Sequence, residues 1–118
     1  ERLAHEKGLF DLKQDRGGIV DIEFLVQYLV LKNARRFPDI IVWTDNIRLI
    51  EALSVEGIIS GHESQVLQEA YVVIRQVIHR LTLQEKGLTV PENLFRETAG
   101  AVTRIYDAYL KQGECALS

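Results

Sequence analysis

The densest group of residues that could do chemistry lies in the segment KQDRGGIVDIEF, residues 13–24. Two adjacent glycines, Gly17 and Gly18, precede an apolar run, and backbone amides left free at a helix start can hold an anion. Lys13 and Arg16 would add positive charge to such a site. The alternative is a flexible hinge and an ordinary helix start, in which Asp21 interacts favourably with the helix dipole. The spacing alone favours this alternative.

Glu23 and Gln27 form a second candidate pair, because they lie four residues apart and share one face of the helix expected after the glycines. That face is apolar, and a carboxylate buried there must find a partner or its pKa rises. Two interpretations follow: a buried hydrogen-bond network between helices, or a catalytic role for Glu23. The network is favoured because no second carboxylate shares this face; Asp21 lies about 160° around the helix.

Arg75 and His79 form a third candidate pair, again four residues apart. They lie off the main apolar stripe of their expected helix and are flanked by Val72 and Leu83, which indicates a second, half-buried face. Such a face suits contact with another domain or with the start of the first long helix, where one of the two cations would pair with an acid. The alternative is an ordinary surface arginine and histidine.

The rest of the chain carries no recognisable catalytic, metal-binding or cofactor-binding motif. The histidines, His5, His62 and His79, are scattered, and the single cysteine, Cys115, is distant from them, so no zinc pattern occurs. There is no Walker A loop, no G-x-G-x-x-G and no Gly-Ser…Asp-x-Asp signature of polymerase-β-like nucleotidyltransferases. We therefore predict no catalytic residue, no metal site and no cofactor in this chain by itself.

The composition is that of one globular domain. The 118 residues are 47% hydrophobic and 26% charged, with a formal net charge of −3, which argues against a general nucleic-acid binder. The apolar stretches are too short for a membrane-spanning helix, and the charged N-terminus has no signal-peptide core. A single cysteine fits a reducing compartment. The expectation is a cytoplasmic protein with no nucleic-acid and no membrane partner.

Apolar periodicity punctuated by glycine and proline predicts four helices, over residues 19–36, 45–56, 60–86 and 91–110. Pro38 ends the first helix, and Thr44 is the candidate N-cap of the second. Ser60 and Glu63 match a capping box at the start of the third. Residues 9–16, before the glycines, are interpreted as an extended linker.

The connections between these segments are short, so mostly antiparallel neighbours are expected. The predicted fold class is all-α, an up-and-down helical bundle of four main helices with an extended N-terminal linker. The expected organisation is a linker from a preceding domain over residues 1–18, the bundle over residues 19–112 and a frayed tail over residues 113–118. The core is expected to hold Ile19, Ile22, Val26, Leu29, Val30, Leu31, Ala34, Trp43, Ile47, Ile50, Leu53, Val66, Ala70, Val73, Ile74, Val77, Leu81, Phe95, Ala99, Val102, Tyr106 and Tyr109.

Three blocks of the sequence resemble one family of enzymes, in the same order. FDLKQDRGGIVDIEFLVQYLVLKNA, residues 10–34, resembles the linker-to-helix signature of bacterial glutamate–ammonia-ligase (glutamine synthetase) adenylyltransferases. That signature has a Lys, a variable stretch, Gly-Gly-Ile-x-Asp-Ile-Glu-Phe and a Gln three residues on. WTDNIRLIEAL and AYVVIRQVIHRLTLQEK, residues 43–53 and 70–86, are similar to the family's next helices. The matching positions are Lys13, Gly17, Gly18, Asp21, Glu23, Phe24, Gln27, Arg75, His79 and Gln84.

The resemblance has three departures. Many family members have Gly where this chain has Asp15, which makes an anion-holding loop less secure here. Many have Glu where it has Ile78, so a network that uses that acid is absent. After Tyr109 the sequence does not resemble the family closely.

The resemblance implies a place in a two-headed enzyme. In that family, two related nucleotidyltransferase halves are each followed by a helical domain. One half uses ATP and a divalent metal, Mg²⁺, to adenylylate a tyrosine of glutamine synthetase, and the other removes the AMP by phosphorolysis, under the control of PII signalling proteins and glutamine. This chain would be the C-terminal helical domain, inactive alone, that supports the preceding, adenylylating nucleotidyltransferase domain and contacts glutamine synthetase or the PII signalling protein.

Two other interpretations stay open. The chain could be the matching helical segment of the related PII uridylyltransferase, which phosphohydrolase and amino-acid-sensing domains further along the gene would indicate. It could also be a stand-alone helical interaction module, which a gene of only this length would indicate.

Overall fold

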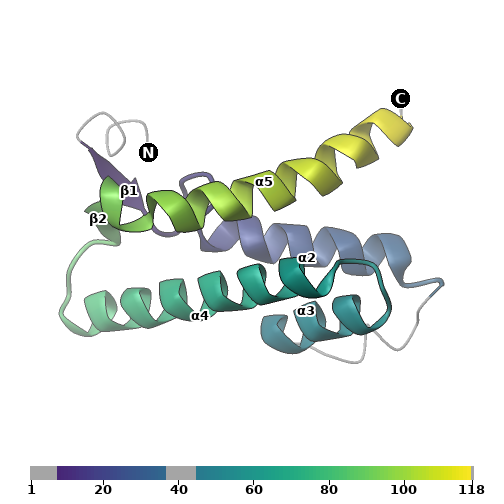
Figure 1. Ribbon diagram of the computed structural model, residues 1–118. Coiled ribbons are helices and arrows are strands. Elements are labelled where there is room, and N and C mark those ends of the chain that lie inside the picture. Colours follow the sequence, from purple (N-terminus) through teal and green to yellow (C-terminus); the bar gives the residue numbers. More distant parts are fainter. Residues whose placement is uncertain (1–7, 37–44, 118) are drawn as a thin grey trace.

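The computed structural model describes residues 8–36 and 45–117, with side-chain surroundings through Lys111. The described part is mainly helical, with one small two-stranded sheet, and the predicted all-α bundle of four main helices is confirmed (Figure 1). The elements, in chain order, are β1 (Leu9–Asp11), α2 (Ile19–Asn33), α3 (Asn46–Val55), α4 (Gly61–Leu83), β2 (Thr89–Pro91) and α5 (Glu92–Leu117).

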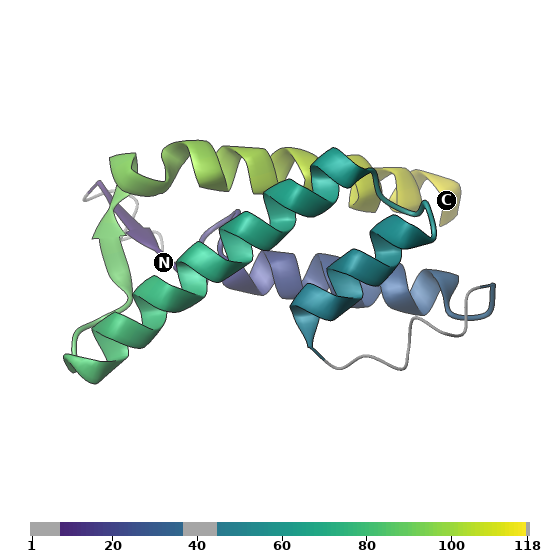
Figure 2. The ribbon, with the colours of Figure 1, turned by 60° about the horizontal axis from the view of Figure 1, so that its bottom comes forward.

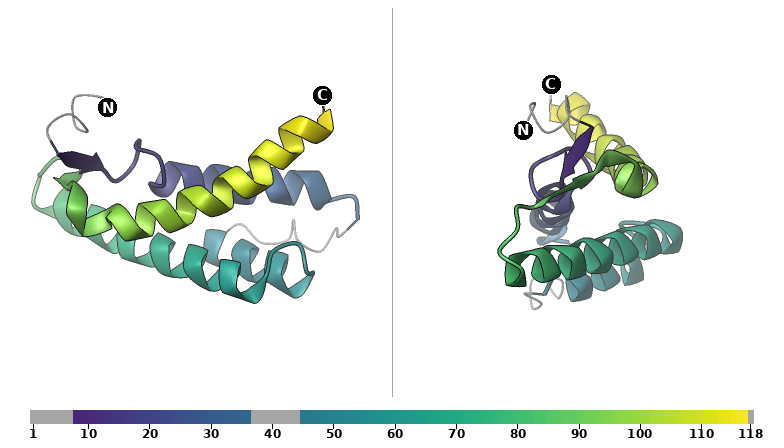
Figure 3. Two further views of the ribbon diagram at one scale, coloured as in Figure 1. Left: turned by 45° about the horizontal axis from the view of Figure 1, so that its top comes forward. Right: turned by 90° about the vertical axis from the view of Figure 1, so that its left-hand side faces the viewer.

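Helices α2 and α4 are central, because each of them contacts the other three helices. Figure 3 shows α5 on one side of α2 and the α3–α4 pair on another. The chain direction alternates from α3 to α4 and from α4 to α5, whereas α2 and α3 run roughly the same way (Figure 1). No helix in residues 8–36 and 45–117 is long and apolar enough to cross a membrane.

The predicted helix starts agree with the observed ones to within one residue. Ser60 accepts a hydrogen bond from the Glu63 amide at 3.0 Å, and the Glu63 carboxylate accepts one from the Ser60 amide at 2.9 Å, so the capping box is confirmed. The N-cap of α3 is Asp45, which accepts from the Ile47 amide at 3.0 Å, and not Thr44. Thr44 itself, together with Trp43 and Pro38, lies outside the described residues.

The helix ends differ more from the predictions. Helix α2 ends at Asn33, where the Asn33 side chain donates to the Leu29 carbonyl at 2.8 Å, three residues before the predicted end. Helix α4 ends at Leu83 and not at residue 86, because Glu85 adopts a left-handed backbone with φ of 57°. Helix α5 continues to Leu117, so the backbone is helical through most of the segment predicted to be frayed. Gly113, the single glycine in this segment, weakens the helix without ending it.

The segment interpreted as an extended linker is part of the domain core. Strand β1 pairs antiparallel with β2, with Phe10 opposite Val90. Phe10 also stacks on Phe95 of α5 with ring centroids 6.0 Å apart, and Leu12 is completely buried. The linker interpretation is therefore wrong for residues 9–16. The sequence did not predict β1 because a three-residue strand carries no periodic signal.

The core lies where the four helices and β1 meet, and most of the predicted core positions belong to it. Two are wrong: Leu31 is 74% exposed and Val73 is 44% exposed. Helix α2 is apolar over a wide arc, so its neighbours decide which part of the arc is covered. The buried apolar side chains are Phe10, Leu12, Ile19, Ile22, Leu25, Val26, Leu29, Val30, Leu49, Ile50, Leu53, Ile59, Leu67, Ala70, Tyr71, Ile74, Phe95, Val102 and Ile105.

Candidate functional site

An open hollow of about 380 Å³ brings four of the predicted site residues together: Lys13, Glu23, Arg75 and His79. They come from three separate parts of the chain. Lys13 follows β1, Glu23 lies in the second turn of α2, and Arg75 and His79 occupy successive turns of α4. The remaining lining residues are Ile19, Ile78, Thr82 and Leu88, three of them apolar. The hollow thus combines three basic side chains and one carboxylate with apolar surface.

Arg75 is held in place by Tyr71, one turn earlier on α4, and Tyr71 is in turn hydrogen-bonded to α3. Its Nη1 donates to the Tyr71 hydroxyl at 3.2 Å, and the same hydroxyl accepts from Asn46 Nδ2 at 3.1 Å. The guanidinium carbon lies 5.7 Å from the centroid of the Tyr71 ring. The hydrogen bond to Tyr71, followed by the negative charges of Glu23 and Asp45, raises the pKa of Arg75, so this group stays a cation at any physiological pH.

Glu23 and Gln27 do not form the predicted buried network. Gln27 is exposed to solvent, and Glu23 is half-buried at the rim of the hollow. Among the described residues Glu23 makes no hydrogen bond, and its relation to Arg75 is the attraction of two opposite charges. The buried arc of α2 is centred on Ile22 and Val26, so Glu23 and Gln27 fall at its edge, where water can reach them.

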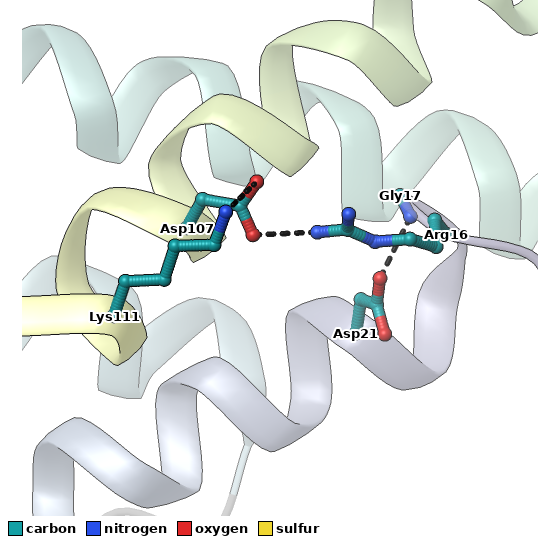
Figure 4. Close-up of polar contacts among 5 residues, drawn as sticks. All are labelled: Arg16, Gly17, Asp21, Asp107 and Lys111. Carbon is teal, nitrogen blue, oxygen red and sulfur yellow. Dashed lines mark hydrogen bonds and ion pairs between the residues drawn. The ribbon is translucent and has the colours of Figure 1, made fainter. Parts of the chain in front are cut away.

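The amides of the Gly-Gly turn are not free to hold an anion. All four amides from residue 17 to residue 20 donate within the chain, so the anion-holding interpretation is wrong for this turn. Gly17 donates to the Asp21 carboxylate at 2.8 Å (Figure 4), and Gly18, Ile19 and Val20 donate to the carbonyls of Asp15, Leu12 and Lys13 at 2.9, 2.9 and 3.4 Å. Asp21 therefore has its partner inside this chain.

The two glycines serve close packing, and the hinge interpretation is also wrong. Gly17 has φ of 83°, and a Cβ placed there would lie 2.4 Å from the carbonyl oxygen of Ala99 in α5. A Cβ on Gly18 would lie 2.6 Å from the Leu12 carbonyl oxygen. A larger side chain at Gly17 would push the turn away from α5, and one at Gly18 would collide with the backbone of the turn itself, so the glycines hold a rigid corner.

Polar and aromatic contacts that the sequence did not predict tie this corner to α5. Arg16 pairs with Asp107 at 2.5 Å, and Lys111 approaches the other carboxylate oxygen of Asp107 at 3.8 Å (Figure 4). The Arg16 guanidinium also lies 6.0 Å from the centroid of the Tyr106 ring. These partners are some 90 residues apart in sequence, and no local pattern connects them.

The hollow can hold an anionic group between Lys13 and Arg75, with Glu23 available to accept hydrogen bonds and apolar surface to contact an organic group. Over residues 8–36 and 45–111, whose side chains the structure describes, no group of three or more His, Cys, Asp or Glu side chains could hold a metal ion.

The family model described as GlnD PII-uridylyltransferase matches residues 2–102, which is most of the sequence. The chain belongs to the GlnD PII-uridylyltransferase family. Its match extends over β1, the hollow, both glycines and the first part of α5, so the geometry described above is that of a GlnD PII-uridylyltransferase family domain.

Three curated relatives are named bifunctional glutamine synthetase adenylyltransferase/adenylyl-removing enzyme. The protein of Shewanella loihica is 40% identical over 112 residues, 95% of this chain and 12% of the relative. That of Nitrosococcus oceani is 44% identical over 104 residues, 88% of this chain and 11% of the relative. That of Shewanella woodyi is 45% identical over 108 residues, 92% of this chain and 11% of the relative. The chain thus spans about one ninth to one eighth of their length.

Proposed function

We propose that this chain is the C-terminal helical domain of a bifunctional glutamine synthetase adenylyltransferase/adenylyl-removing enzyme. The observation that carries the proposal is identity of 40–45% to enzymes of that name over 88–95% of the chain. In this proposal the domain supports the adenylylating nucleotidyltransferase half. That half would bind ATP and Mg²⁺, and the enzyme would act on glutamine synthetase in the cytoplasm under the control of the PII signalling protein.

The hollow is the surface through which we expect the domain to act. Lys13 and Arg75 present fixed positive charge at the junction of β1, α2 and α4, and His79 lies one turn beyond Arg75. A neighbouring nucleotidyltransferase domain would bind polyphosphate and phosphoryl groups. Cations such as these attract the negative charge of those groups. The rigid Gly-Gly corner would keep these groups in one position relative to that neighbour.

The test uses the full-length enzyme that contains this domain, with glutamine synthetase and ATP labelled in its α-phosphate. Arg75→Ala combined with Lys13→Ala should reduce AMP transfer to glutamine synthetase. Arg80→Ala is the matched control, since Arg80 is an exposed cation on the same helix that does not line the hollow. Equal activity of all three proteins would exclude the hollow from the reaction, and absence of AMP transfer by the unaltered enzyme would reject the proposed function itself.

A second candidate, the helical segment of a PII uridylyltransferase, is supported by the description of the matching family model. The two candidates differ in nucleotide and in protein substrate. Parallel incubations of the full-length enzyme, with labelled ATP and glutamine synthetase or with labelled UTP and PII, separate them. Label on glutamine synthetase supports the first proposal, and label on PII supports the second.

A further inference from the structure

A groove runs between α4 and α5 on a different face of α4 from the hollow described above. It consists of two adjoining depressions of about 320 and 270 Å³, which share Val66 and Ala101 as lining residues. Figure 2 shows the reason: α4 crosses α5 at an angle, so that the two helices are close near the start of α4 and diverge toward its end. The first depression is further lined by Glu69, Ala70, Val73, Glu97 and Thr98, and the second by His62, Glu63, Arg104, Ile105 and Ala108.

One large apolar side chain stands exposed on the same face of α5. Leu94 is 65% exposed. Seven residues bring an α-helix to within about 20° of two full turns, so Leu94, Ala101 and Ala108 share one face of α5. Leu94 therefore lies beyond one end of the groove, and the depression that contains Ala108 lies at the other end.

The charges along the groove are arranged most simply on α5. Glu97 lines the first depression with Glu69 of α4, whereas Arg104 lines the second with His62 and Glu63 of α4, and the Glu63 carboxylate already accepts hydrogen bonds from the Ser60 amide and the Tyr109 hydroxyl. Both Glu97 and Arg104 are exposed, and neither belongs to an ion pair within the described part of the chain. Helix α5 thus presents one acid, Glu97, and one base, Arg104, toward opposite ends of the groove, each without an ion-pair partner among the described residues.

We propose that this face binds a second copy of the chain, with the two α5 helices antiparallel across a two-fold axis beside Ala101. A two-fold contact requires a surface that is complementary to itself when turned end for end. This face meets the requirement twice. Leu94 comes opposite Ala108 of the second copy and enters its depression, and Glu97 comes opposite Arg104 of the second copy. Each contact occurs twice in the pair, because the axis repeats it.

The charge pattern gives a test that an unrelated partner would not pass. Glu97→Arg alone places like charges together at both ends of the contact, and Arg104→Glu alone does the same. The double exchange, Glu97→Arg with Arg104→Glu, restores opposite charges. A helix from a different protein, or from elsewhere in a longer polypeptide, would lose its complementarity in the double exchange as well.

The experiment is sedimentation equilibrium of the 118-residue chain over a concentration series that reaches about 1 mM, the weak limit of specific association. We expect a reversible dimer, at least tenfold weaker in each single variant and restored in the double exchange. Arg80→Glu, on an exposed position outside the groove, should leave the dimer unchanged, and circular dichroism should show the same helicity in all five proteins. A monomeric unaltered chain, single variants that dimerise normally, or a double exchange as weak as the single variants would each overturn the proposal.

Discussion

The Gly-Gly corner and the hollow beside it share one stretch of sequence but use their polar groups in opposite ways. In the corner, the amides of Gly17 and Gly18 are satisfied within the chain, and both glycines are in close contact with other backbone. In the hollow, the polar ends of Lys13, Arg75 and His79 belong to exposed residues. Within the motif, the two glycines are therefore structural, whereas Lys13, which meets residues of α4 in the hollow, is available for binding, and substitutions should distinguish the corner from the hollow by their effect on stability.

The largest loss of stability is expected for Gly17→Ala. The new methyl group would meet the Ala99 backbone, which cannot move aside as a side chain can, and the left-handed backbone of Gly17 adds strain. We expect a decrease of about 3 kcal/mol in the free energy of unfolding, measured by urea titration with circular dichroism. Gly57→Ala is the matched control, because Gly57 has φ of 76° but nothing within 4 Å of its Cβ position. Similar losses in both variants would show that close packing is not what Gly17 provides.

Asp21→Ala should have the next largest effect. It removes the acceptor of the Gly17 amide, which is then left without a partner in a buried turn. A loss of about 1–2 kcal/mol in the free energy of unfolding is expected. Asp21→Asn keeps one acceptor oxygen and should lose clearly less. If the two substitutions are equally harmful, the negative charge near the helix start matters more than the hydrogen bond.

The start of α4 offers a titratable structural contact for comparison with the corner. Burial alone would raise the pKa of Glu63, but hydrogen bonds from the Ser60 amide and from the Tyr109 hydroxyl outweigh it, so the pKa lies below its ordinary value of 4.5. The folded state therefore binds the proton more weakly than the unfolded state. The contribution of Glu63 to stability is complete above pH 4.5 and is lost as the pH falls through the folded-state pKa.

Glu63→Gln tests this contribution through the difference in melting temperature from the unaltered chain. The difference should be present at neutral pH and shrink in acid, by an amount equivalent to about 1 kcal/mol once solvent screening is allowed for. Tyr109→Phe removes one of the two hydrogen bonds and should show part of the same shrinkage. A difference that stays constant from neutral pH to acid would mean that the carboxylate charge contributes nothing.

The smallest effect is expected for Glu23→Ala, in the hollow. Glu23 is half-buried, forms no hydrogen bond with the described residues and interacts with Arg75 only through charge. Such a pair contributes less than about 1 kcal/mol, so the free energy of unfolding should change by about 0.5 kcal/mol or less. A loss as large as that of Asp21→Ala would place Glu23 among the structural residues and remove the contrast between corner and hollow.

Some parts of the fold could be predicted because they depend on neighbours in sequence. The capping box of Ser60 and Glu63 is such a case, since three residues of chain bring its two partners together. The N-cap of α3 was misplaced by one residue, because Asp45 and Thr44 are both good caps and only the backbone conformation distinguishes them. Strand β1 was missed because its partner, β2, lies about 80 residues further along the chain.

The sequence by itself determined the helical class, the family resemblance and the set of residues worth testing, because helix periodicity, caps and motif spacing are local properties. Only the tertiary structure decided which of those residues meet. Lys13, Glu23, Arg75 and His79 share a hollow because the loop after β1, α2 and α4 converge there, while Gln27, one turn beyond Glu23, faces water. The role of Gly17 was equally hidden, because it depends on the backbone of Ala99, which lies alongside only because α5 packs against α2.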